Sequence, residues 1–270
     1  MTADEHPTTG YPPLSRSYKQ DFHFRLATTS FIYPDHIVPN VRMLAPFINE
    51  IELLFFESTE PGSLPGTDDI KELQQLAEAH DITYNIHLPL DISLTAAAAE
   101  TRQTAIDTIK GLFELAAPLT PTTWTVHLPE ADIDQDFDSW YERAGDSLSR
   151  ICPGHIRGAQ LSVETLSYPL EWIDPLIAEF DLSICLDIGH MAIHGLDWEA
   201  FYHSRAPRIP IIHLYGFERA HEHKGLDLLS TGRRREIGAL LQAFSGTLCL
   251  EVFSYNHLEA SLAVLKQMMT

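Results

Sequence analysis

Eight short apolar segments recur along this chain, and most are separated by stretches long enough to hold a helix. They occupy residues 25–30, 51–57, 82–87, 123–127, 161–164, 182–186, 209–214 and 247–253. Most are continuous apolar runs of β-prone residues, which is typical of strands buried on both faces of a parallel sheet. Eight strand–helix units in roughly 250 residues form the pattern of a (β/α)8 barrel. We therefore predict an α/β protein with the architecture of a TIM barrel.

The stretches between the predicted strands carry helical patterns. Helices are predicted over residues 68–80, 137–151, 168–180 and 198–204, and apolar residues at helical spacing mark further helices around Phe113, Leu241 and Leu262. Between residues 31 and 47, three prolines argue against a long helix. The alternative fold is an open, doubly wound sheet. It usually has fewer strands and often a glycine-rich phosphate turn after the first strand, which this sequence lacks.

Residues 1–20 are polar and contain prolines, so we expect a loose N-terminal tail followed by one barrel domain over residues 21–270. The tail lacks the apolar segment of a signal peptide, and no apolar run approaches the ~20 residues of a membrane span. The three cysteines are an odd number, and Cys185 and Cys249 fall in predicted strands. This usage favours a reduced, cytoplasmic compartment over a disulfide framework.

The formal net charge of −20 bears on the class of partner. Nucleic-acid binding depends on Lys and Arg side chains that neutralise phosphates, so such an acidic chain is not expected to bind nucleic acid. The clustered basic run at residues 233–235 opens a predicted helix, where a solvated helix face accounts for it. We expect a small-molecule substrate and no membrane partner, and the oligomeric state stays open.

Polar side chains stand where the predicted strands end. The strand over residues 182–186 runs into Asp187 and is expected to stop in a turn at Gly189, which puts Asp187 and His190 at one strand tip. Similar tips, with the loop after the seventh strand, supply the other candidates: His87, His127, Glu164, His213, His221, His223 and Glu251. In a (β/α)8 barrel the carboxyl ends of all strands meet at one mouth, so these side chains can converge.

Each candidate also has an ordinary structural explanation, because a single histidine in a strand is usually a hydrogen-bonded core residue. Buried carboxylates could be paired with Arg, but few Lys or Arg fall in the predicted strands, and an unpaired buried carboxylate is costly. Imidazole and carboxylate without thiolate suit Zn, Mn, Fe(II) or Co. Nine candidates are too many for one ion, so we predict two or three divalent ions that share carboxylates. Clustered ions can bind a phosphodiester and activate water.

The order His, His, Glu, Asp-x-x-His, His, His-x-His, Glu resembles the xylose-isomerase-like barrel superfamily, and within it the endonuclease IV (AP endonuclease family 2) pattern. The resemblance extends from Arg25 to the C-terminus. It implies one ion at His87, His127 and Glu164, with Glu164 bridging to a second ion. The second ion would be held by Asp187, His213 and Glu251, and a third by His190, His221 and His223. The endonuclease pattern has Asp where this chain has His221, which changes the charge of the third position.

Three further stretches, residues 28–34, 51–58 and 84–89, are similar to the bacterial cobamide-remodelling phosphodiesterases of this superfamily. That similarity implies hydrolysis of the nucleotide-loop phosphodiester of cobamides, with Glu164 and Glu251 as the catalytic carboxylates. Arg219 and Lys224 could hold the phosphate, although both could be ordinary exposed cations. Tyr33 could line a pocket for a flat ligand, or it could simply pack in the core.

Two other functions remain open. A sugar isomerase or epimerase resembles this chain in Glu164, Asp187, His213 and Glu251 around one ion, with proton transfer beside a carbonyl as its chemistry. Such an enzyme has no evident use for the additional histidines, which favours the phosphodiesterase. The other possibility is a barrel that has lost catalysis and only binds a corrinoid or sugar. The complete set of candidate ligands argues against it.

Overall fold

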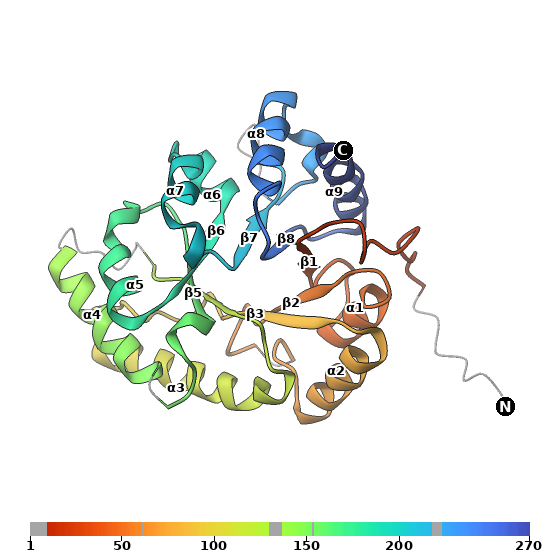
Figure 1. Ribbon diagram of the computed structural model, residues 1–270. Coiled ribbons are helices and arrows are strands. Elements are labelled where there is room, and N and C mark those ends of the chain that lie inside the picture. Colours follow the sequence, from red (N-terminus) through yellow and green to blue (C-terminus); the bar gives the residue numbers. More distant parts are fainter. Residues whose placement is uncertain (1–9, 61, 130–136, 153, 218–222) are drawn as a thin grey trace.

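The computed structural model describes residues 10–60, 62–129, 137–152, 154–217 and 223–270. Eight parallel strands close into a barrel in chain order, which confirms the predicted (β/α)8 architecture (Figure 1). The strands are β1 (Arg25–Thr29), β2 (Glu50–Leu54), β3 (Thr83–His87), β4 (Trp124–Val126), β5 (Leu161–Glu164), β6 (Ser183–Asp187), β7 (Ile211–Leu214) and β8 (Thr247–Leu250). Pairing of β1 with β8, at Ala27 and Cys249 for example, closes the ring.

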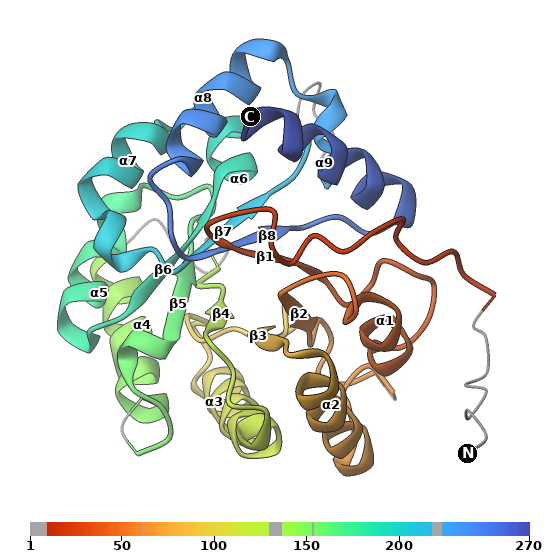
Figure 2. The same ribbon diagram turned by 45° about the vertical axis from the view of Figure 1, so that its right-hand side comes forward.

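Helices surround the barrel in both views of the ribbon (Figures 1 and 2). They are α1 (Ile37–Leu44), α2 (Thr67–His80), α3 (Ala99–Ala116), α4 (Phe137–Ile151), α5 (Asp174–Phe180), α6 (Ile188–Ile193), α7 (Trp198–Arg205), α8 (Thr231–Leu241) and α9 (Tyr255–Met268). The prediction over residues 168–180 was too long, because a short 3-10 turn over Leu170–Trp172 precedes α5. Within the described residues, no helix has both the length and the apolar character that crossing a bilayer requires.

Side chains alternate between the two faces of each strand, which separates the core from the barrel interior. Tyr84 on β3 points outward, where its hydroxyl donates to the carbonyl of Leu73 on α2 at 2.8 Å. Glu50 and Glu52 on β2 share the opposite, inward face, and both are completely buried. This interior is more polar than the branched apolar packing usual in such barrels.

Glu50 closes the amino-terminal end of the barrel. Its carboxylate accepts hydrogen bonds from Thr83 at 2.6 Å, Asn85 at 2.9 Å and Thr122 at 3.0 Å, and it pairs with Arg25 at 3.2 Å. Because several donors and one cation satisfy this carboxylate, its burial is explained by structure alone.

The transition from β6 to α6 differs from the expected turn. Gly189 lies inside α6, and the Asp187 carboxylate caps this helix by accepting the backbone N–H of His190 at 2.7 Å. A Cβ atom at Gly189 would lie 2.3 Å from Cζ of Tyr215, so only glycine permits this approach. The helical turn keeps Asp187 and His190 on the same side of the barrel mouth.

Residues 10–20 also differ from the expected loose tail, because they pack along the barrel wall beside α9 (Figure 2). Leu14 and Tyr18 are buried in the core, and the backbone N–H of Tyr18 donates to the carbonyl of Phe47 at 2.9 Å. The hydroxyl of Tyr33 donates to the carbonyl of Pro12 at 2.8 Å. Residues 1–9 of the expected tail lie outside the described range.

Candidate metal centre

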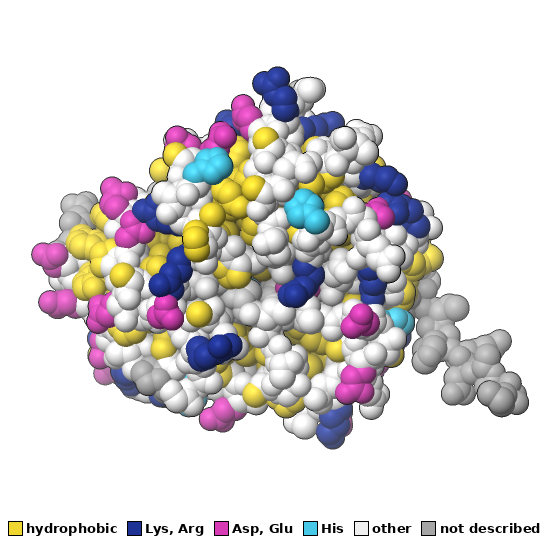
Figure 3. Space-filling model, viewed as in Figure 1, with side chains coloured by type: hydrophobic (Ala, Val, Ile, Leu, Met, Phe, Trp, Pro, Cys, Tyr) yellow, Lys and Arg dark blue, Asp and Glu magenta, His cyan; other side chains and the backbone are white. Residues whose placement is uncertain are grey.

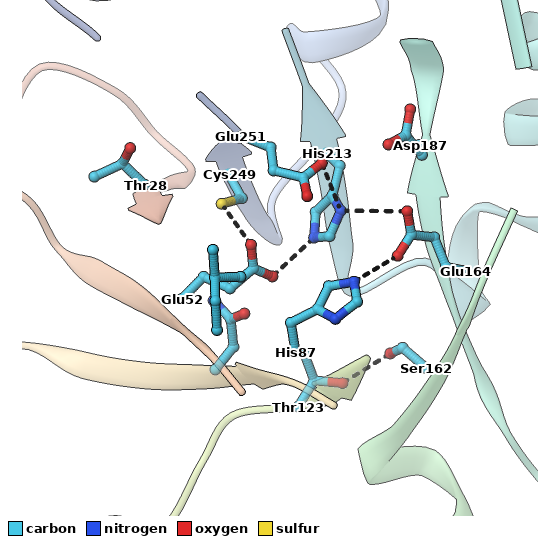
Figure 4. A network of polar contacts seen from close by, with 12 residues as sticks. Thr28, Glu52, His87, Thr123, Ser162, Glu164, Asp187, His213, Cys249 and Glu251 are labelled. Atoms are coloured by element: carbon cyan, nitrogen blue, oxygen red, sulfur yellow. Dashed lines mark hydrogen bonds and ion pairs between the residues drawn. The ribbon is translucent and has the colours of Figure 1, made fainter. Parts of the chain in front are cut away.

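Six predicted ligands meet at the carboxyl ends of the strands. They are His87 on β3, His127 after β4, Glu164 on β5, Asp187 on β6, His213 on β7 and Glu251 after β8. Figure 4 shows five of them pointing toward one another. All are buried except His127, whose side chain is 22% exposed. The barrel therefore brings together residues that lie far apart in the sequence.

Glu164 lies between two groups of these ligands. Its Oε2 atom is 3.0 Å from Nε2 of His87 and 2.9 Å from Nε2 of His127. Its Oε1 atom is 3.7 Å from Nδ1 of His213, on the side of the other carboxylates. The two oxygens of one carboxylate thus face two different ligand sets, which is the arrangement of a bridging ligand.

Each ligand set is compact enough to surround one ion. One ligand atom from each of Glu164, Asp187, His213 and Glu251 lies within 4.8 Å of the others. The same limit holds for His87, His127 and Glu164. Two donors that bind one ion with bonds of about 2.0–2.2 Å are at most ~4.4 Å apart, so both sets are close to the spacing that a bound ion would require.

Unpaired atoms test whether the four-residue set fits a cation. Asp187 Oδ2, His213 Nδ1 and Glu251 Oε2 are buried and have no hydrogen-bond partner among the described residues. Buried polar atoms nearly always have a hydrogen bond, whereas these three have only longer contacts, such as the 3.4 Å between Nδ1 of His213 and Oε2 of Glu251. The donor set of carboxylates and imidazole fits a divalent cation, which would satisfy all three atoms.

The pKa values at this site also indicate an excess of buried negative charge. Burial raises the pKa of Asp187 well above its usual range, and the charges of Glu164 and Glu251 raise it further. Burial opposes ionisation of Glu164 as well, yet His127 and His213 hold the pKa of Glu164 well below its usual range. Burial also works against protonation of His87, but its hydrogen bond to Glu164 and that charge raise the pKa of His87 to about 9. Several buried carboxylates at one site thus call for protons or a cation.

The third predicted position is described only in part. Nε2 of His190 is 3.7 Å from Oδ2 of Asp187, and Nδ1 of His223 is 3.6 Å from Oε2 of Glu251. The centroids of the two imidazole rings are 6.3 Å apart. His221, the remaining predicted ligand, lies outside the described residues.

Two of the three predicted substrate contacts, Lys224 and Tyr33, lie within the described residues. Arg219 also lies outside the described residues. The backbone of Lys224 pairs with Gly216, which anchors the end of this loop beside β7. Tyr33 is 3% exposed, and its ring stacks on Tyr11 with centroids 5.1 Å apart, so packing accounts for this side chain.

Residues 48–268 match the sequence family described as xylose isomerase-like TIM barrel. The chain belongs to this family. Among curated protein sequences, no match was found.

Solved structures with this fold include several kinds of enzyme. A D-tagatose 3-epimerase-like protein is 16% identical, with a TM-score of 0.75 over 91% of this chain and 97% of that chain. Endonuclease IV from Thermus thermophilus is 16% identical, with a TM-score of 0.67 over 91% of this chain and 98% of that chain. A probable 3-DHS dehydratase of petrobactin synthesis from Bacillus anthracis is 18% identical, with a TM-score of 0.70 over 92% of this chain and 99% of that chain. Similarity at this level establishes the fold alone.

One buried carboxylate of this xylose isomerase-like barrel was missed in the sequence. Glu52 on β2 is completely buried, and its Oε1 atom is 2.9 Å from Nε2 of His213. The signal was the sequence EIELL, which places two carboxylates at alternate positions of an apolar strand and therefore on one face. No strand tip marks Glu52, because two further residues of β2 follow it.

Proposed function

We propose that this protein is a divalent-metal-dependent phosphodiesterase that hydrolyses the nucleotide-loop phosphodiester of cobamides. The observation that carries this proposal is that two histidines contact the same oxygen of Glu164, Oε2. His87 and His127 approach Oε2 at 3.0 and 2.9 Å, while Oε1 faces the four-residue set. This geometry supports ions on both sides of one carboxylate. A barrel that uses a single ion does not need the two additional imidazoles.

Bound divalent ions would supply positive charge for the phosphoryl oxygens and a water activated for attack on phosphorus. The protein's own residues set the geometry for that reaction. Glu164, buried and approached by histidines at both oxygens, fixes the spacing of the two ligand sets. His223 donates from Nδ1 to the carbonyl of Glu251 at 3.1 Å, which leaves its Nε2 as the ring atom that could bind an ion or contact the substrate.

An apolar rim beside these ligands supports a substrate with a broad apolar face. Phe56 contacts the rings of Phe31, Phe253 and His87, with centroids 5.9 to 6.0 Å apart. Phe253 also lies 5.0 Å from the ring of His223. Phe253 is 37% exposed, and Leu90, whose backbone bonds to Phe56, is 48% exposed. Exposed apolar side chains next to a polar centre are typical of a ligand site.

The surface charge is compatible with a small substrate. On the face shown in Figure 3, basic side chains are interspersed with acidic ones and do not form a continuous basic surface. The whole chain has a net charge of −20, which opposes the binding of a long polyanion. A compact phosphodiester meets far less of this repulsion.

The second candidate is a single-ion sugar isomerase or epimerase. The four-residue set of Glu164, Asp187, His213 and Glu251 is complete without the other histidines. Under this function His87 and His127 would act only as hydrogen-bond donors that orient Glu164.

Metal content and substrate turnover, measured on the same preparation, distinguish these candidates. We expect two or three equivalents of Zn, Mn, Fe or Co per chain by elemental mass spectrometry, for protein purified without a tag or chelator. We also expect the metal-loaded protein to release the nucleotide-loop fragment from a cobamide. One equivalent per chain together with turnover of a ketose or aldose would replace this proposal with the isomerase.

A further inference from the structure

Glu52 contacts His213, a candidate ligand, from inside the barrel, although Glu52 is not one of the predicted ligands. Its side chain extends from β2 across the barrel interior toward β7 and β8 (Figure 4). Oε1 lies 2.9 Å from Nε2 of His213, and Oε2 accepts the thiol of Cys249 at 3.3 Å. Both carboxylate oxygens of Glu52 therefore have a hydrogen-bond partner: Oε1 contacts His213 on β7, and Oε2 contacts Cys249 on β8.

The surroundings of Glu52 contrast with those of Glu50, two residues earlier on the same inward face. Arg25 and several neutral donors satisfy Glu50. Among the described residues, the ion-pair partner of Glu52 is His213 alone. Burying a carboxylate whose only ion-pair partner among the described residues is one imidazole costs free energy, which indicates a role beyond packing.

When His213 is neutral, as a metal-binding imidazole must be, its contact with Glu52 determines which nitrogen carries the proton. An ionised carboxylate can only accept, so Nε2 of His213 must be the N–H group that donates to Glu52. In the neutral imidazole, Nδ1 then has a free lone pair. That atom lies 3.4 Å from Oε2 of Glu251 and 3.7 Å from Oε1 of Glu164, and it has no hydrogen-bond partner in the described chain.

We propose that Glu52 is a positioning residue for the metal centre and that Cys249 holds its carboxylate in place. Glu52 fixes the orientation and tautomer of His213, so that Nδ1 faces Glu164 and Glu251, with which it would hold an ion. Carboxylates that orient a metal-bound histidine in this way raise its basicity and its affinity for the ion. This inference rests on the metal dependence of the proposed function, but not on its substrate.

Glu52, His213 and Cys249 also lie within 4.8 Å of one another, as a metal site would require. The contacts at 2.9 and 3.3 Å are, however, hydrogen bonds with a donor on one side and an acceptor on the other. The atoms of Glu52, His213 and Cys249 in these contacts are hydrogen-bonded to one another, whereas Asp187 Oδ2, His213 Nδ1 and Glu251 Oε2 in the four-residue set have no hydrogen bond among the described residues.

The test compares Glu52→Gln with Glu50→Gln, which remove the same charge from the same strand at equal burial. Co(II) alone is titrated into metal-stripped, full-length protein in competition with a chromophoric chelator. We expect Glu52→Gln to weaken binding at one site by about 10- to 100-fold, with an altered Co(II) absorption spectrum. Glu50→Gln should bind Co(II) like the wild type. Equal affinities for wild type and Glu52→Gln, or equal weakening by both variants, would overturn the inference.

A second pair of variants keeps the test decisive if Glu52→Gln does not fold. Cys249→Ser retains a hydroxyl donor for Glu52, and Cys249→Ala removes the donor. We expect weaker Co(II) binding for Cys249→Ala than for Cys249→Ser, and equal binding would contradict the role of Cys249. If the wild type binds ions without cleaving phosphodiesters, the proposed function fails while this inference stands. If the wild type binds no ion, both fail.

Discussion

Oε2 of Glu164 lies 2.9 Å from Nε2 of His127, a side chain that remains 22% exposed at the barrel mouth. The carboxylate itself is buried, and its other oxygen, Oε1, lies 3.7 Å from Nδ1 of His213 in the four-residue set. The contact therefore joins the solvent-facing part of the candidate centre to its buried part. Any change at Glu164 is expected to affect both parts together.

The first prediction concerns Glu164→Gln. The amide keeps the size of the side chain, so the variant should fold, but it loses the charge and one anionic oxygen. We expect loss of bound metal and a fall in hydrolysis of at least about 100-fold, because the ions supply several kcal/mol of transition-state stabilisation. Elemental mass spectrometry and a hydrolysis assay measure the two effects. Glu114→Gln, on the exposed face of α3, is the control and should change neither quantity.

The second prediction separates the two ligand sets. His87→Gln and His127→Gln each remove an imidazole that contacts Oε2 of Glu164, and both leave the four-residue set intact. We expect each variant to lose about one equivalent of metal, retain the rest, and lose hydrolysis. The exposed His155→Gln is the control. Unchanged metal content in both variants, together with turnover of a ketose or aldose, would favour the single-ion isomerase.

The strand tips were predictable because two local signals coincide there. Asp187 and His213 stand at or near the end of an apolar run, and a parallel barrel brings all such ends to one mouth. Glu52 was not predictable in this way. The sequence EIELL marks Glu52 as facing inward, but its contact with His213 across the barrel is set by strand register, which no local pattern contains.

The N-terminal segment shows a second limit of sequence patterns. Leu14 and Tyr18 are single apolar residues in a polar, proline-containing stretch, without helical or strand periodicity. They are nevertheless buried, because the barrel wall offers them an apolar surface and Phe47 a backbone partner. Packing of an irregular segment follows from the surface that it meets, which the segment's own sequence does not contain.

The third prediction concerns the apolar rim. Phe253→Ser removes an exposed ring whose centroid lies 5.0 Å from that of His223 and 5.9 Å from that of Phe56. If the rim holds the apolar face of the substrate, KM for a cobamide should rise by about 10-fold, in line with the roughly 1.5–3 kcal/mol carried by a buried Phe side chain. Metal content should not change. Phe253→Leu keeps much of the apolar surface and should show a smaller rise. An unchanged KM in Phe253→Ser would remove the rim from the binding site.

The last prediction concerns Gly189, where α6 passes the ring of Tyr215. A Cβ atom there would lie 2.3 Å from Cζ and 2.6 Å from the hydroxyl oxygen of Tyr215, so the helix or the ring must move. Gly189→Ala should lower the free energy of unfolding by about 1–3 kcal/mol, as overpacking of a core commonly does. Because Asp187 caps this helix and His190 lies in it, the same shift should also weaken metal binding.

Gly111 provides the matched control for this variant. It lies in α3, where a Cβ atom would meet nothing within 4 Å apart from its chain neighbours and the backbone of its own helix, so alanine fits there. Gly111→Ala should raise the free energy of unfolding by about 0.5–1 kcal/mol, because alanine loses less conformational entropy in a helix than glycine does. Chemical denaturation of the metal-stripped proteins measures both values. If Gly189→Ala were stabilised as much as Gly111→Ala, the close approach of α6 to Tyr215 would not constrain the centre.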